Sequence, residues 1–163
     1  MKNQEIERKF LIDRFPEDLT LLEEAVVWQG YISADPVVRI RKKVTTDGSS
    51  YRLCFKSKGT LVRKEIELEL TAEKFDALAE LLPIPPVRKD YKVFALADGL
   101  RLECSLVDAG APESFYYAEV EFESEEQALA FAPLPFLGEE KTQEPAFTMS
   151  RYWQAKVAKV QGG

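Results

Sequence analysis

The sequence of 163 residues predicts an α+β fold in which an antiparallel sheet or barrel is accompanied by a few helices. Hairpin signals dominate the chain, and no regular alternation of strands and helices indicates a parallel sheet. Charged and apolar residues alternate along the strand-like segments with a period of two. Because neighbouring side chains of a strand point to opposite faces, each strand should carry one charged and one apolar face.

The N-terminal segment predicts the first strand. Glu5, Glu7 and Lys9 would share one of its faces, and the residues between them would share the other. Two adjacent carboxylates repel each other unless a cation or a lysine offsets their charge. This strand is therefore a candidate site for a metal ion and an anion together.

The chain then alternates turns with further strands. Residues 13–24 predict a short helix or loop that starts at Pro16. Turn signals occur at Ala34-Asp35-Pro36, at 46–49, at 57–60 and at Asp98-Gly99. The strands expected between these breaks are residues 25–33, 36–45, 50–58, 61–70, 87–96, 100–107 and 115–123.

Three segments predict helices. Thr71 is a candidate N-cap for a helix over residues 71–82, and the prolines that follow it should end that helix. Ser124 is a candidate cap for a short helix over 124–132, and a C-terminal helix is expected over about 148–160. Their apolar residues would cover the apolar side of the sheet.

The composition excludes several classes of function. The chain has no histidine, so it holds neither a Ser-His-Asp nor a Cys-His nucleophile system, nor a zinc site with histidine ligands. The net charge of −6 argues against generic nucleic-acid binding. The sequence contains no run of about eighteen apolar residues, so no membrane helix is expected. Cys54 and Cys104 have no metal-site spacing, so we expect a reducing, cytoplasmic setting.

The charged strand faces separate by sign. One group of strands is basic and carries Arg39, Arg41, Arg52 and Lys56, whereas a later strand carries Glu119, Glu121 and Glu123. The simplest interpretation is an antiparallel sheet with one solvated face. If the sheet curls so that its charged faces point inward, it forms a water-filled tunnel with a basic and an acidic wall, and the helices cover the outside.

Opposed walls of this kind suit a polyphosphate that chelates a metal ion. Arginine forks bind phosphate oxygens in bidentate contacts. Without histidine, a metal would be held by carboxylates, which favours hard ions such as Mg²⁺, Mn²⁺ or Ca²⁺. The matching chemistry is phosphoryl transfer to water, which depends on positioning and charge stabilisation.

An ordered set of motifs resembles the CYTH family, the triphosphate tunnel metalloenzymes. The resemblance covers nearly the whole chain and implies a single domain over 1–163, built as a closed antiparallel barrel with a charged interior. Members of the family hydrolyse inorganic tripolyphosphate, thiamine triphosphate or nucleoside triphosphates with Mg²⁺ or Mn²⁺, and some are adenylyl cyclases. The matching motifs are Glu5-Ile6-Glu7-Arg8-Lys9-Phe10-Leu11, Gln29-Gly30-Tyr31-Ile32-Ser33, Val38-Arg39-Ile40-Arg41, Phe55-Lys56, Arg63-Lys64-Glu65-Ile66-Glu67, Ala118-Glu119-Val120-Glu121-Phe122 and Gly138-Glu139-Glu140-Lys141-Thr142.

The resemblance also implies roles for individual residues. The metal ligands would be Glu5, Glu7, Glu119 and Glu121. The triphosphate would be bound by Arg39, Arg41, Lys56, Arg63 and Arg88. Lys9 would act in catalysis together with Glu5 and Glu7. Supporting positions along the tunnel would be Glu65, Glu67 and Glu103.

Three positions depart from the family pattern. Asp90 stands where a phosphate-binding arginine is usual, Ser105 where an aspartate is usual, and Ala146 lies in a segment without its usual basic residue. Asp90 and Ser105 lie on the two arms of one predicted hairpin. We therefore hypothesise that Asp90 supplies the carboxylate that Ser105 lacks.

Three functions compete on this basis. The first is a divalent-metal-dependent triphosphatase acting on inorganic tripolyphosphate. The second is a non-catalytic polyphosphate- or nucleotide-binding protein of the same fold, which the departures favour. The third is an adenylyl cyclase. For each of these functions we expect a small-molecule triphosphate as partner, no nucleic acid and no membrane. The chain is expected to act as a monomer or homodimer.

Overall fold

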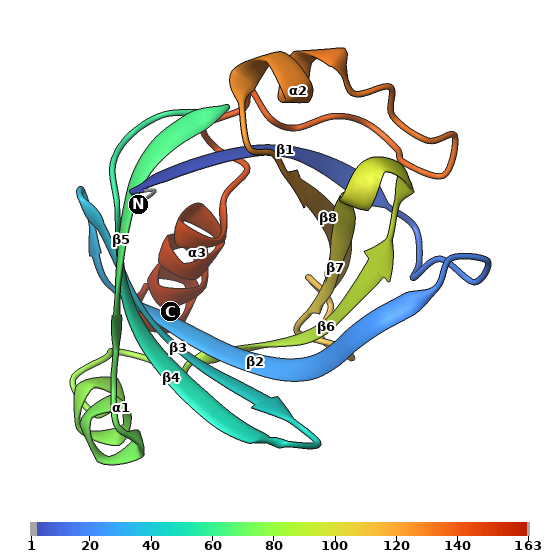
Figure 1. Ribbon diagram of the computed structural model, residues 1–163. Coiled ribbons are helices and arrows are strands. Elements are labelled where there is room, and N and C mark those ends of the chain that lie inside the picture. Colours follow the sequence, from blue (N-terminus) through green and yellow to red (C-terminus); the bar gives the residue numbers. More distant parts are fainter. Residues whose placement is uncertain (1–2, 163) are drawn as a thin grey trace.

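The computed structural model describes residues 3–162, and these form a closed antiparallel barrel of eight strands (Figure 1). Around the barrel the strands follow the order β1-β5-β4-β3-β2-β6-β7-β8. The predicted closed barrel is thereby confirmed. The strands are β1 Gln4–Ile12, β2 Leu21–Ala34, β3 Val37–Thr45, β4 Gly48–Lys56, β5 Val62–Glu69, β6 Val87–Ala95, β7 Arg101–Val107 and β8 Phe115–Glu121.

The first strand closes the barrel by pairing with two partners in turn. Residues Gln4 to Ile6 of β1 pair with β5, and Glu7 to Ile12 pair with β8. All other neighbours are joined by antiparallel ladders. Since β1 changes partner at Glu7, the acidic residues of this strand lie at the seam between β5 and β8.

Three α-helices lie outside the sheet or across one of its ends. They are α1 Ala72–Ala79, α2 Glu125–Ala130 and α3 Met149–Gln161, and their N-caps are Thr71, Ser124 and Thr148. Each cap hydroxyl accepts a backbone N–H three residues further on, as N-caps do. In Figure 1, α1 and α2 lie outside the ring of strands, whereas α3 is seen through the barrel opening.

The hydrophobic core is divided into clusters at the outer face of the barrel, at the end that α3 covers and along part of its inner face. Under α2, Phe10, Leu102 and Val120 project from β1, β7 and β8 into one buried cluster. At α3, Trp153 packs with Tyr31 and Val107 in a second cluster. A third cluster of Ala25, Val27, Tyr91 and Val93 contributes Val27 and Tyr91 to the lining of the cavity, whose other lining side chains are mostly charged.

Two local expectations are settled by the structure. Between Asp13 and Thr20 the chain forms a loop without helix, and β2 starts at Leu21, four residues before the predicted strand. The Asp98-Gly99 turn is a short 3₁₀ segment, Ala97–Gly99, in which Asp98 adopts a left-handed φ of 61°. Within residues 3–162, no helix has the length and apolar character needed to span a membrane.

Candidate active site

The interior of the barrel is a cavity of about 680 Å³, and inward-facing side chains of all eight strands line it. Most of these side chains are charged, because the inner positions of the strands are the charged positions of the alternating pattern. The segment 146–152 and Ala155 of α3 line the cavity as well. The sequence-predicted tunnel with a charged interior is therefore present.

One wall of the cavity is basic. Arg39, Arg41 and Lys43 project from β3, and Arg52 and Lys56 project from the neighbouring β4. The ladder places Arg41 directly opposite Arg52. Like charges this close oppose folding unless an anion or carboxylates lie near them. This wall can therefore bind an extended polyanion along its length.

The facing wall is acidic. Glu7 of β1 lies opposite Glu121 of β8, and Glu119 lies opposite Glu103 of β7. Burial, with repulsion from Glu119 and Glu5, raises the pKa of Glu7 well above its usual value. Burial and the neighbouring carboxylates raise the pKa of Glu121 to about 7. The carboxylates of the acidic wall repel one another, and such a cluster suits the binding of a cation.

Glu5 lies where the two walls meet and is held by two cations. Lys56 Nζ is 3.0 Å from Glu5 Oε2, and Arg63 Nη2 is 3.1 Å from Glu5 Oε1. Burial alone raises the pKa of Glu5, but Lys56 and Arg63 outweigh that effect and lower it to about 2. Glu5 is therefore a carboxylate at any physiological pH.

Lys9 is held from the C-terminal part of the chain. Its ammonium group donates to the backbone carbonyl of Phe147 over 3.1 Å, and its backbone N–H donates to Thr142 Oγ1 over 3.0 Å. The backbone N–H of Lys141 in turn donates to the carbonyl of Lys9. The Lys9 side chain is buried and lines the cavity.

Arg88, predicted to bind the triphosphate, does not line the cavity. Its side chain is 52% exposed, pairs with Asp90 over 3.0 Å and lies against the Trp28 ring. The physical reason is the phase of β6, in which Val87, Lys89 and Tyr91 are the buried, inward positions. Lys89 and Tyr91 replace Arg88 in the tunnel.

The same phase contradicts the hypothesis about Asp90. Asp90 pairs in register with Leu106, and its carboxylate contacts Arg88 on the outer surface. It therefore does not replace the carboxylate that is missing at Ser105. It also removes no positive charge from the tunnel, because it faces away from it. Ala146, the third departure, lines the cavity.

Lys89 is a cavity residue that sequence reasoning missed as a site residue. Its ammonium group donates to Tyr117 Oη over 2.9 Å, and the side chain is 6% exposed. Burial, reinforced by Arg41 and Arg39, lowers the pKa of Lys89 to about 7, although Glu119 opposes the shift. Its alternation with Val87 and Tyr91 was the signal that could have identified it.

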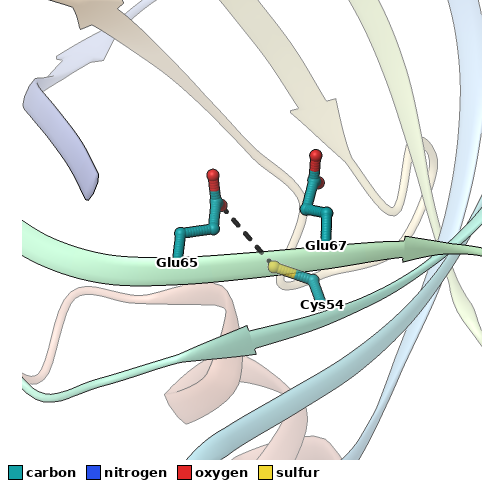
Figure 2. A group of neighbouring side chains, drawn as sticks. All are labelled: Cys54, Glu65 and Glu67. Carbon is teal, nitrogen blue, oxygen red and sulfur yellow. Dashed lines mark hydrogen bonds between the residues drawn. The ribbon is translucent and has the colours of Figure 1, made fainter. Parts of the chain in front are cut away.

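The predicted supporting residues Glu65 and Glu67 project from β5 toward the cavity beside Cys54 of β4 (Figure 2). The thiol donates to Glu65 Oε2 over 3.5 Å, and one ligand atom from each of the three residues lies within 4.8 Å of the others. Glu65 also pairs with Lys56 over 3.4 Å. Burial raises the pKa of Cys54 to about 11, so the protonated thiol serves here as a hydrogen-bond donor.

The predicted metal ligands fit a hard divalent ion. Glu5, Glu7, Glu119 and Glu121 all line the cavity and supply oxygen donors alone, which suits Mg²⁺ or Mn²⁺. A divalent cation between them would relieve the repulsion that raises the pKa of Glu7 and Glu121. Within residues 3–162, their oxygens do not form a group with all members inside 4.8 Å.

One end of the cavity is lined by aromatic residues and by α3. Phe147 packs edge-on against Phe115 and Tyr117, with ring centroids 5.9 Å and 6.2 Å apart. Asp108 fixes α3, since it accepts a hydrogen bond from Tyr152 and one from Lys156 over 2.7 Å. The charged part of the cavity is thus bounded at this end by an ordered segment.

Known proteins share both the sequence and this architecture. An inorganic triphosphatase from Nitrosomonas europaea is 35% identical over 143 residues, which cover 88% of this chain and 92% of that protein. The crystal structure of the inorganic triphosphatase NE1496 superposes with a TM-score of 0.63 at 30% identity, covering 91% of this chain and 93% of that one.

More distant structures share the fold. A putative adenylyl cyclase from Hippeastrum, described as having a dominant triphosphatase activity, matches with a TM-score of 0.56 at 16% identity, over 77% of this chain and 82% of that one. The PH1819 protein from Pyrococcus horikoshii matches with a TM-score of 0.59 at 16% identity, over 95% and 99%. No family profile matches the sequence. With its charged closed barrel and its 35% identity to an inorganic triphosphatase, the chain belongs to the CYTH family of triphosphate tunnel enzymes.

Proposed function

We propose that this protein hydrolyses inorganic tripolyphosphate to phosphate and pyrophosphate, as a single CYTH-like tunnel domain over residues 1–163. The opposed walls of the cavity are the observation that carries this proposal. A basic wall on β3 and β4 faces an acidic wall on β1, β7 and β8, inside one cavity of about 680 Å³. The activity named for the Nitrosomonas relative supports the inorganic substrate.

The basic residues would bind the anion and neutralise its charge. Arg39 and Arg41 present guanidinium groups that suit bidentate phosphate contacts, and Lys56 and Arg63 lie deeper against Glu5. Lys89 replaces Arg88 in this set. When the anion binds, its charge favours the protonated form of Lys89, which would then add one more positive charge.

The carboxylates Glu5, Glu7, Glu119 and Glu121 would hold the divalent cation that enzymes of this family generally need. Such an ion shields phosphate charge and lowers the pKa of a water molecule. We propose Mg²⁺ or Mn²⁺, because the donors are all oxygens. Lys9, held by Phe147 and Thr142, would keep its ammonium group on the phosphoryl group under attack.

The reaction is a displacement at phosphorus. The oxygen of water forms a bond to the terminal phosphorus and its proton passes to solvent, while the bridging P–O bond breaks and the pyrophosphate leaves with the bonding electrons. Catalysis of this step rests on positioning and on stabilising the charge of the departing oxygens. The basic wall is placed to do both.

A substrate panel tests the proposal. Phosphate release is measured with tripolyphosphate, thiamine triphosphate and ATP, each with Mg²⁺ or Mn²⁺, for the wild type and for Glu5→Gln. We expect tripolyphosphate to be the best substrate and Glu5→Gln to be strongly impaired. Binding of triphosphates without any turnover would show a binding protein instead, and formation of cyclic AMP from ATP would show a cyclase.

The remaining expectations about the protein stay predictions. We expect a cytoplasmic location, a small-molecule triphosphate as partner, and a monomer or homodimer. Size-exclusion chromatography with light scattering measures the oligomeric state.

A further inference from the structure

Gln29 of β2 is a buried polar residue in the barrel wall. It is 0% exposed, and its amide nitrogen donates to Tyr31 Oη over 2.8 Å. Its other amide atom, Oε1, is buried and has no hydrogen-bond partner within residues 3–162. Buried side-chain amides normally satisfy both ends, so a half-satisfied one calls for a reason. Among the described residues, Tyr31 is the hydrogen-bond partner of this amide.

Tyr31 lies two residues further along the same strand and therefore on the same face, where it lines the cavity. Its ring packs against Trp153 of α3, with the centroids 6.0 Å apart. Its hydroxyl oxygen accepts the proton of the Gln29 amide. Within residues 3–162, the hydroxyl proton of Tyr31 has no acceptor. That proton is therefore available to a ligand in the cavity.

The neighbouring strand carries a second donor of this kind. Arg39 is the register partner of Tyr31 on β3, and its buried Nε atom has no hydrogen-bond partner in the described part of the chain. Tyr31 and Arg39 thus lie side by side in the lining of the cavity, and each carries a donor that no group among residues 3–162 satisfies. A phosphate oxygen accepts hydrogen bonds from donors of both kinds.

We propose that Gln29 is a positioning residue that directs the Tyr31 hydroxyl proton into the tunnel, where it donates to a phosphate oxygen. A tyrosine hydroxyl has one proton and can turn it toward whichever acceptor is nearer. Because the Gln29 amide nitrogen offers only protons, the Tyr31 oxygen must accept from it and point its own proton elsewhere. This inference rests on the proposed triphosphatase function and adds to that site a residue that orients a substrate-binding hydroxyl.

Replacing Gln29 by glutamate reverses the hydrogen bond. A carboxylate accepts protons and donates none, so it would draw the Tyr31 proton into the wall. Gln29→Met keeps the size of the side chain and removes the hydrogen bond without offering an acceptor. The two substitutions therefore separate loss of support from active misdirection of the same hydroxyl.

The test is a double-mutant cycle between position 29 and Tyr31→Phe, with tripolyphosphate hydrolysis as readout. We expect Tyr31→Phe and Gln29→Glu each to lower kcat/KM by about 10- to 100-fold, the range expected for one charged hydrogen bond. Gln29→Met should lower it by a few fold. In the Tyr31→Phe background, neither change at position 29 should lower it by more than about twofold, because the proton to be directed is gone.

Controls separate positioning from packing. Gln154→Met on the exposed side of α3 is the matched substitution and should leave kcat/KM unchanged. Melting temperatures identify variants that fail to fold, in which case Gln29→Met carries the cycle alone. If the effects at positions 29 and 31 multiply in the double variants, Gln29 acts through packing and the proposal is overturned.

Binding and hydrolysis measured on the wild type separate a failure of this inference from a failure of the proposed function. If the wild type binds tripolyphosphate but does not hydrolyse it, the proposed function fails, and the same cycle is measured as the Kd by calorimetry, with the same coupling expected. If the wild type hydrolyses tripolyphosphate and the cycle shows no coupling, only the inference fails. A wild type that neither binds nor hydrolyses a triphosphate refutes both.

Discussion

Replacing Lys56 by methionine removes a positive charge that lies between the two proposed ligands of the tunnel. Lys56 Nζ is 3.0 Å from Glu5 Oε2 and 3.4 Å from Glu65 Oε2, and the side chain is 8% exposed. It therefore neutralises carboxylates on one side and faces the phosphate site on the other. The variant should change the affinities for metal and for triphosphate in opposite directions.

The two magnitudes follow from charge and distance. Loss of one charged contact to the anion corresponds to about 1.5–3 kcal/mol, so tripolyphosphate should bind about 10- to 100-fold more weakly. Lys56 lies 3.0 Å from Glu5, a proposed metal ligand, so its repulsion of a divalent ion held there amounts to roughly 1–5 kcal/mol for dielectric constants between 80 and 20. Mn²⁺ should therefore bind about tenfold more tightly, or better, when no triphosphate is present.

Calorimetry measures both affinities separately, with tripolyphosphate titrated in the absence of metal and Mn²⁺ in the absence of anion. Lys58→Met is the matched control: Lys58 is two residues away, and its 85% exposed side chain pairs with Asp35 over 3.3 Å. Exposed pairs of this kind contribute little, so the control should shift neither affinity by more than about twofold. Weaker or unchanged Mn²⁺ binding by Lys56→Met would refute the assignment of the cation to the carboxylates around Glu5.

Three further predictions concern β6 and the outer wall. Lys89→Met should weaken tripolyphosphate binding by about tenfold or more, whereas Arg88→Met should change it less than twofold, since of these two residues Lys89 lines the cavity. Calorimetry measures both affinities, and equal losses would contradict the inward orientation of Lys89. The folded protein loses the Lys89 proton near pH 7, whereas the unfolded chain keeps it up to pH 9. The free energy of unfolding should therefore rise between pH 7 and pH 9, and more steeply in the wild type than in Lys89→Met. Denaturant titrations at both pH values check this, and parallel changes would rule it out. Arg8→Ala should lower the free energy of unfolding by about 2–3 kcal/mol, because Arg8 donates to the carbonyls of Ala128 and Phe131 and pairs with Glu140 over 2.7 Å. The control Lys74→Ala, at an exposed position, should lower it by less than about 0.5 kcal/mol. Thermal melts that fail to separate the two variants would count against this role of Arg8.

The strand positions and the charge of the two walls were open to prediction from sequence. Where charged and apolar residues alternate without interruption, as in β1 from Glu5 to Lys9, the pattern specifies which side chains share a face. The sign of the charge then separates the acidic strands from the basic ones. The departures from the expected boundaries lie at the ends of strands and helices, such as the start of β2 at Leu21 and the end of α1 at Ala79.

The failure at β6 shows the limit of that reasoning. Arg88, Lys89 and Asp90 are charged in succession, so the charges do not reveal which of them face inward. Burial of Val87 and Val93 on the inner side, in register with β2 and β7, determines the phase. A shift of one residue then exchanges every side chain between tunnel and surface.

The sequence by itself determined the closed barrel, its family and the residue types that its tunnel presents, because strand periodicity and charge are local properties of the chain. The tertiary structure decided which of the charged residues on β6 enter the tunnel and how the key side chains are held. Thr142 and Phe147 hold Lys9 across more than a hundred residues, and Asp108 accepts hydrogen bonds from Tyr152 and Lys156 of α3. Such contacts arise from barrel closure and from the docking of α3, which bring together groups whose distance along the chain carries no signal.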